Sequence, residues 1–86
     1  MLLLLFENPS ISISLACYTD IHGSAQSDKK LSEDRAKTVA DYLESHGIKQ
    51  DRITLKGYGH NLTVAPTNKK EGRQLNERLE VQVINP

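Results

Sequence analysis

Hydrophobic residues alternate with polar or small ones along residues 10–18, which is the pattern of a β-strand. The apolar side chains that fall on every second position are Ile11, Ile13, Leu15 and Cys17. Because successive side chains of a strand point to opposite faces, this period of two predicts a strand over 10–18 with one buried face. Cys17 lies on the buried side of this pattern, where a free cysteine behaves as a small hydrophobe.

A second pattern follows, in which apolar residues recur at a spacing of three and four. Its members are Ala36, Val39, Ala40 and Leu43. This spacing forms one stripe on a helix and predicts a helix over about 32–46. Ser32 is a good N-cap for that helix, and Gly47 stands where a left-handed residue often ends a helix. The polar loop from 20 to 30 has no periodicity.

The remaining pattern predicts shorter elements and no internal repeats. Alternating apolar residues mark two further strands; they are Ile53 and Leu55, then Leu79, Val81 and Val83. The expected elements are an N-terminal helix remnant over 1–7, a strand over 52–56 that ends at Gly57-Tyr58-Gly59, a loop over 60–67, a helix over 70–78 and a last strand over 79–84.

Two charged residues stand on either side of the first strand-to-helix connection. Asp20 follows the first strand, and Arg35 is expected in the first turn of the next helix. Both should therefore lie at the carboxyl edge of the sheet, where open α/β sheets usually bind ligands. A ligand with an ammonium and a carboxylate would find Asp20 for the first and Arg35 for the second. Free backbone N–H groups behind Ser32 would favour the same carboxylate.

The same two residues also have a purely structural interpretation. Asp20 would then only organise a turn after the strand. Arg35 would be a solvated helix residue paired with Asp34 or Glu33, an exposed ion pair worth about 0–1 kcal/mol. Spacing alone favours this structural interpretation over a ligand site.

The order of short motifs resembles the OmpA-like C-terminal domains, the peptidoglycan-binding modules of OmpA, the Pal lipoprotein and the stator protein MotB. The resemblance covers roughly residues 7 to 84. The motifs that carry it are Cys17-Tyr18-Thr19-Asp20-Ile21-His22-Gly23-Ser24, Leu31-Ser32-Glu33-Asp34-Arg35-Ala36, Tyr42-Leu43, Gly47-Ile48, Arg52-Ile53, Gly57-Tyr58-Gly59 and Glu71-Gly72-Arg73-Gln74-Leu75-Asn76-Glu77-Arg78-Leu79-Glu80.

This resemblance implies an α+β fold, a two-layer sandwich in which a mixed β-sheet has helices on one face. The element order it implies is β-α-β-α-β with the family's first strand missing. Residues 1–86 are then a single OmpA-like domain that is incomplete at its N-terminus. Met1-Leu2-Leu3-Leu4-Leu5-Phe6 would be the apolar end of a truncated helix that stops before Pro9. That run is shorter than the roughly 20 residues of a membrane span.

The resemblance also implies a ligand and a set of residues that bind it. In OmpA-like domains the Asp and Arg that match Asp20 and Arg35 hold the meso-diaminopimelate of the peptidoglycan stem peptide. Five further positions match residues that line or support that pocket, namely Thr19, Asp28, Leu31, Asn76 and Arg78.

The chain departs from the family pattern at several of these motifs. Cys17-Tyr18 replaces the usual Gly-His, and His60 replaces the Glu of Gly-x-Gly-Glu. Asp28 replaces an asparagine and adds negative charge beside the expected pocket, so asparagine at 28 is expected to tighten binding. Glu77 replaces an arginine in the Asn-Arg-Arg motif and reverses a charge next to it.

Composition narrows the possible functions. The 86 residues carry 11 basic and 11 acidic side chains. This even balance gives no excess of basic charge of the kind that binds nucleic acid. The histidines have no i, i+4 partner and no neighbouring cysteine ligand, so no metal site is expected. No nucleophile motif and no dinucleotide loop is present, so neither an enzyme nor a cofactor is expected.

The interpretation favoured by the sequence is non-covalent peptidoglycan binding in the periplasm, by a segment that tethers an outer-membrane-associated parent protein to the cell wall. The alternative is a structural or assembly module that does not bind the wall and forms a homodimer through an exposed sheet edge. A wall hydrolase ranks third.

Overall fold

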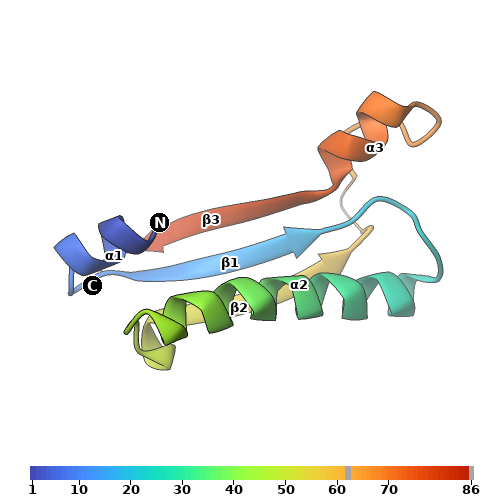
Figure 1. Ribbon diagram of the computed structural model, residues 1–86. Coiled ribbons are helices and arrows are strands. Elements are labelled where there is room, and N and C mark those ends of the chain that lie inside the picture. Colours follow the sequence, from blue (N-terminus) through green and yellow to red (C-terminus); the bar gives the residue numbers. More distant parts are fainter. Residues whose placement is uncertain (62, 86) are drawn as a thin grey trace.

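Three helices, three strands and a 3₁₀ turn form the described part of the chain, which is residues 1–61 and 63–85 of a computed structural model. In chain order they are α1 (Leu2–Glu7), β1 (Ser12–Tyr18), α2 (Ala25–Ser45), the 3₁₀ turn (Gln50–Arg52), β2 (Ile53–Gly59), α3 (Lys70–Asn76) and β3 (Arg78–Ile84). From β1 onward the order is β-α-β-α-β, as the sequence predicts (Figure 1).

The strands form one mixed sheet in the order β2-β1-β3. β1 is parallel to β2 and antiparallel to β3, and Leu15 lies opposite both Leu55 and Val81. Figure 1 shows α2 running along β1 and β2 on one face, while α3 lies beyond the end of the sheet. The predicted α+β architecture, a mixed sheet with helices packed on it, is therefore confirmed.

The core lies between α2 and the buried face of β1. Its buried members are Leu5, Ile11, Ile13, Leu15, Ala40, Leu43 and Ile48. They include the predicted buried side of the first strand and part of the helical stripe, because both patterns bring apolar side chains to one surface. Cys17 is also buried, and this burial raises the pKa of its thiol.

Helix α2 begins seven residues before the predicted start at Ser32. Its N-cap is Ser24, whose hydroxyl accepts a hydrogen bond from the backbone N–H of Ser27. Ser32 instead lies inside the helix, where its hydroxyl donates to the carbonyl of Lys29 and accepts from the N–H of Gly59. The prediction was wrong because the first two turns carry no apolar stripe, although Ala, Gln and Lys there are good helix formers.

Strand β2 continues through Gly57 and Gly59, the residues that the sequence reading expected to end it. A Cβ atom on Gly57 would lie 2.3 Å from the backbone nitrogen of Glu33, and Gly59 has a φ of +60°. These glycines are needed where β2 passes directly against α2, and they do not mark a turn.

Helix α1 is held to the rest of the fold by apolar side chains and one cation. Leu5 is fully buried in the core, and Leu2 packs against it. Arg52 donates hydrogen bonds to the carbonyls of Leu5, Asn8 and Ile11, two of which lie at the end of the helix. A guanidinium thus satisfies carbonyl groups that the short helix leaves without partners.

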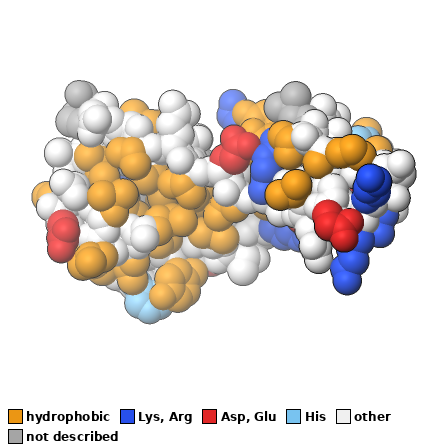
Figure 2. All heavy atoms as spheres, turned by 90° about the horizontal axis from the view of Figure 1, so that it is seen from above, with side chains coloured by type: hydrophobic (Ala, Val, Ile, Leu, Met, Phe, Trp, Pro, Cys, Tyr) orange, Lys and Arg blue, Asp and Glu red, His pale blue; other side chains and the backbone are white. Residues whose placement is uncertain are grey.

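The side of β3 that matches the buried side of β1 is only partly covered. Leu79, Val81 and Val83 lie opposite Cys17, Leu15 and Ile13 in the register, yet they are between 37% and 43% exposed. Seen from above β3, the half of the molecule nearer the termini presents a broad hydrophobic surface (Figure 2). Among the described residues, β3 pairs with β1 only, so its other edge is open.

Candidate functional site

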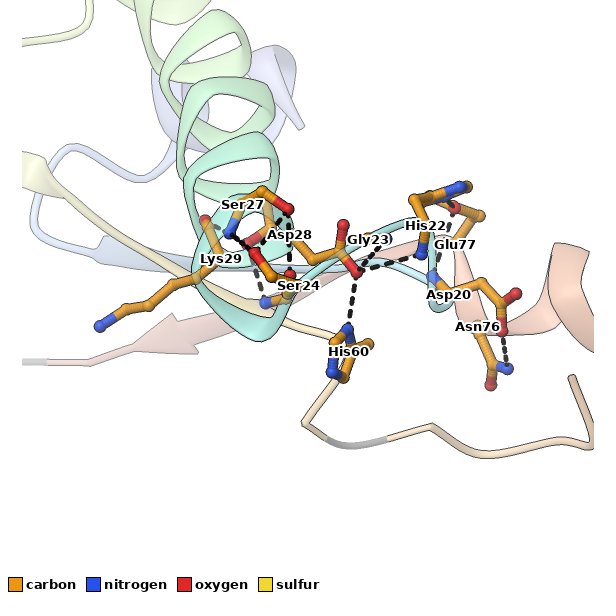
Figure 3. Close-up of polar contacts among 12 residues, drawn as sticks. Asp20, His22, Gly23, Ser24, Ser27, Asp28, Lys29, His60, Asn76 and Glu77 are labelled. Carbon is orange, nitrogen blue, oxygen red and sulfur yellow. Dashed lines mark hydrogen bonds and ion pairs between the residues drawn. The ribbon is translucent and has the colours of Figure 1, made fainter.

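Asp20 lies directly after β1 and is 1% exposed. The chain is fixed there because the N–H of Thr19 donates to the carbonyl of Gly59, at the end of β2. The Oδ1 atom of Asp20 accepts a 2.8 Å hydrogen bond from the Nδ2 atom of Asn76. Figure 3 shows the Asp20 carboxylate directed toward Asn76. The carboxyl end of β1 therefore carries an aspartate of fixed orientation.

Asn76 connects three segments at this end of the sheet. Its Oδ1 atom accepts from the N–H groups of Val64 and Ala65, at 2.7 and 3.0 Å. Its Nδ2 atom donates to Asp20 and to the carbonyl of Ala65. All the hydrogen-bonding capacity of this buried amide is used, so Asn76 positions both Asp20 and the loop before α3.

Arg35 lies in the middle of α2, not in the first turn as predicted, and its side chain is 45% exposed. Its Nη1 atom donates a 2.5 Å hydrogen bond to the Oε2 atom of Glu77. The Oε1 atom of Glu77 accepts from the backbone N–H of Asp20 at 3.2 Å and also contacts the Nε2 atom of His22. Glu77 thus stands between Arg35 and the Asp20 segment.

The environment of Glu77 favours its charged form. Partial burial alone would raise the pKa of this carboxyl. The hydrogen bonds from His22, Asp20 and Arg35, with the positive charge of Arg35, outweigh burial and lower the pKa. Glu77 is therefore a carboxylate at neutral pH, and His22, the backbone N–H of Asp20 and Arg35 hold it in place.

Asp28 has partners on two other segments. Its Oδ2 atom accepts from the backbone N–H groups of His22 and Gly23 and lies 2.6 Å from the Nδ1 atom of His60 (Figure 3). Since an ionised carboxylate only accepts, Nδ1 carries the hydrogen in this contact. The hydrogen bond from His60 lowers the pKa of Asp28 against the opposing effect of burial, and the two backbone bonds add to it.

The positive end of α2 is also located differently from the prediction. Because the helix begins at Ala25, the N–H groups behind Ser32 lie within the helix and are not free. The acidic residue in the first turn is Asp28, so the favourable potential of the helix N-terminus acts on Asp28 and not on a ligand carboxylate beside Arg35.

The three remaining predicted site residues are Thr19, Leu31 and Arg78. Thr19 is 1% exposed, and its Oγ1 atom has no hydrogen-bond partner within the described residues. Leu31 is half-buried on α2, one turn before Arg35. Arg78 is not directed at Asp20: its guanidinium lies 3.9 Å from the ring centroid of Tyr18 and its Nε atom donates to Glu80. Arg78 therefore buttresses the sheet through a cation–π contact.

A shallow hollow lies beside these residues. It is lined by Asp20, Ile21, His22, Lys70, Arg73, Gln74 and Glu77. Its walls carry both acidic and basic groups, which suits a ligand that carries charges of both signs. Within residues 1–61 and 63–85, no group of three or more His, Cys, Asp or Glu side chains is arranged to hold a metal ion.

Sequence reasoning missed the contacts of three residues in this region. The sequence patterns assigned His22 and His60 no role beyond excluding a metal site, and marked Glu77 only as a reversed charge, but each contacts a carboxylate or a guanidinium of the site. The signal available was that positions 28, 60 and 77 all depart from the family pattern. Their partners, 32 to 55 residues away in sequence, are defined only by the fold.

The mixed sheet and its helices have the fold of the OmpA-like class. The profile of the OmpA family matches residues 3–77, and the chain belongs to that family. It is 38% identical over 78 residues to outer membrane porin F of Pseudomonas aeruginosa, covering 90% of this chain and 22% of the porin. It is 39% identical over 75 residues to the peptidoglycan-binding protein ArfA of Mycobacterium tuberculosis, covering 87% of this chain and 23% of ArfA.

A solved structure supports the same fold. The peptidoglycan-associated lipoprotein of Burkholderia pseudomallei superposes with a TM-score of 0.89 at 20% identity, over 96% of this chain and 70% of the lipoprotein. At that identity the similarity concerns the fold alone. The chain spans less than a quarter of the length of the curated relatives it matches. None of the helices in the described residues combines the length and apolar character needed to cross a bilayer.

Proposed function

We propose that this chain binds peptidoglycan non-covalently through the diaminopimelate of the stem peptide. Asp20 takes the ammonium of the diamino acid, and Arg35 takes its carboxylate. Residues 1–86 act as one OmpA-like domain in the periplasm, where they anchor a larger outer-membrane-associated protein to the wall. The name of the relative ArfA, a peptidoglycan-binding protein, points in the same direction.

The observation that carries this proposal is the oriented carboxylate of Asp20. A carboxylate that is 1% exposed and held by Asn76 has little freedom, so it is already placed for a cation that enters the hollow. The buried hydroxyl of Thr19, without a partner in the described residues, lies next in the chain and offers a further polar contact. A preorganised site loses less entropy on binding than a mobile one.

Calorimetric titration tests the proposal with a soluble muropeptide that ends in meso-diaminopimelate. The matched control is the same muropeptide acetylated on the side-chain amine, which removes the ammonium and leaves the carboxylate. We expect heat of binding with the first ligand and none with the second. Equal affinity for both would show that Asp20 does not receive an ammonium.

Asp28 provides a pH-dependent test of the loop that forms the site. A carboxyl whose pKa is lower in the folded state stabilises the fold above its unfolded pKa of about 3.9, and this contribution is lost as pH falls through the folded pKa. Asp28→Asn should therefore lower the melting temperature at pH 7, and the difference from wild type should shrink as the pH falls below about 4. A difference that stays constant from pH 7 to 2.5 would contradict the hydrogen bonds described for Asp28. Since these bonds hold the loop, tighter ligand binding by Asp28→Asn is no longer the expected outcome.

The open edge of β3 supports a second candidate function, assembly through a homodimer. Two copies of β3 pairing antiparallel would satisfy the unpaired edge and place Leu79, Val81 and Val83 beside the same residues of the second copy. We expect light scattering to give the mass of a dimer at tens of micromolar, and Val81→Lys to shift it to a monomer. Thr54→Lys, an exposed change on β2, is the control. A monomeric wild type would exclude this candidate.

A further inference from the structure

The group that the proposed function assigns to a ligand carboxylate already holds a carboxylate of the chain. Arg35 donates to Glu77 at 2.5 Å, and the other oxygen of Glu77 accepts from the N–H of Asp20 and contacts His22. These are the contacts that a bound ligand carboxylate would be expected to make beside Asp20. Glu77 is thus an internal occupant of the carboxylate position.

Glu77 changes which head group fits. A free ligand carboxylate has two ways to enter, since it either displaces Glu77 from Arg35 or stays beside it. Displacement breaks three contacts of Glu77, and coexistence brings two anions together that have only acceptor atoms. Both routes weaken the binding of an anionic head group.

A neutral carboxamide avoids both costs. Its N–H₂ group donates to a Glu77 oxygen, and its carbonyl accepts from a guanidinium N–H of Arg35, which has five such donors. The ammonium of the same ligand then meets two carboxylates, Asp20 and Glu77, which line one hollow. Both polar ends of the ligand then have partners, and Glu77 keeps its contact with Arg35.

The two cations that line the hollow do not bind a ligand carboxylate as well as an unoccupied Arg35 would. Lys70 and Arg73 are exposed on α3, and Arg73 donates to the carbonyl of Thr67. Exposed cations are screened by solvent and salt. Glu77, in contrast, is 28% exposed and lies in direct contact with Arg35.

We propose that Glu77 sets the charge selectivity of this site, so that it favours a diamino-acid head group whose carboxyl is a neutral carboxamide over one whose carboxyl is a free carboxylate. This inference rests on the proposed function and names the ligand class more narrowly. In the proposed complex, Asp20 and Glu77 receive the ammonium, and Arg35 receives the carboxamide oxygen while it keeps its contact with Glu77.

The test is a comparison of two ligands with two proteins. The ligands are identical muropeptides ending in diaminopimelate, with the carboxyl next to the free side-chain amine either free or amidated. The proteins are wild type and Glu77→Gln, which keeps the length of the side chain and removes its charge. Glu71→Gln, an exposed change on α3 that removes the same charge, is the matched control.

We expect wild type to bind the amidated ligand on the order of tenfold more tightly than the free acid, from the repulsion of two nearby like charges. Glu77→Gln should abolish or reverse this ratio, whereas Glu71→Gln should leave it unchanged. A ratio that is the same in wild type and Glu77→Gln, or a wild type that prefers the free acid, would overturn the inference and leave peptidoglycan binding intact. If no protein binds either ligand, the proposed function and the inference both fail.

Discussion

We expect Asp20→Ala and Arg35→Ala each to weaken binding of the diaminopimelate muropeptide strongly. Each change removes one partner of a two-point clamp and with it a charge-assisted contact of about 1.5–3 kcal/mol, so affinity drops tenfold or more. Arg35→Ala has a second effect, because it leaves Glu77 unneutralised beside the ligand carboxylate. Calorimetry and pull-down with insoluble peptidoglycan measure both losses.

The control for these variants is the integrity of the fold. Arg35 is half-exposed, so Arg35→Ala should melt close to wild type. Asp20→Ala leaves the Nδ2 atom of Asn76 with one acceptor fewer, so Asp20→Asn, which retains an oxygen at that place, is the companion variant. Retained pull-down by a folded Asp20→Ala/Arg35→Ala double variant would refute the site and favour the assembly function.

Asn76→Ala should produce the largest loss of stability of any single change at the site. It removes the single oxygen that accepts from the Val64 and Ala65 N–H groups, and the amide nitrogen that donates to Asp20 and to the carbonyl of Ala65. Buried polar groups left without partners cost about 1–3 kcal/mol each, so a total loss of about 3 kcal/mol or more is expected. For a small domain this is a large part of a typical stability of about 5–15 kcal/mol.

Thermal and urea unfolding measure this loss, with Asn68→Ala as the control because Asn68 is exposed in the preceding loop. Asn76→Asp sharpens the result. It places a second carboxyl against Asp20, so its instability should be greatest at neutral pH and relieved on acidification as the pair takes up a proton. If Asn76→Ala were as stable as wild type, the Asn76 amide would not be the group that connects Asp20 to the loop before α3.

The parts of the fold that the sequence predicts are those with a local period. The alternation from Ile11 to Cys17 and the stripe from Ala36 to Leu43 each report a buried surface, and both lie in the core or beside it. The start of α2 was missed because residues 25–31 are polar apart from Ala25 and Leu31 and are stabilised by the Ser24 cap, which leaves no periodic signal.

The ligand site itself stays a prediction, and its internal contacts were not predicted. The strand and helix patterns placed Asp20 and Arg35 at the carboxyl edge of the sheet, and both contact Glu77 there. Neither the patterns nor the resemblance revealed that Glu77 pairs with Arg35 or that His60 contacts Asp28, because these pairs join segments 42 and 32 residues apart. Arg78 was expected to line or support the pocket; it lies opposite Tyr18 in the sheet, where its guanidinium contacts that ring and also donates to the carbonyl of Asn76.

The most direct measurement of ligand binding at Asp20 and Arg35 is a nuclear magnetic resonance titration of the isotope-labelled chain with the diaminopimelate muropeptide. Shifts should appear first in the backbone amides from Asp20 to Gly23 and in the Nε–H of Arg35. The side-chain amide of Asn76, which is bound to Asp20, should respond with them. Saturable shifts confined to this end of the sheet would support peptidoglycan binding by the clamp. An unchanged spectrum at millimolar ligand, or shifts confined to β3, would contradict it.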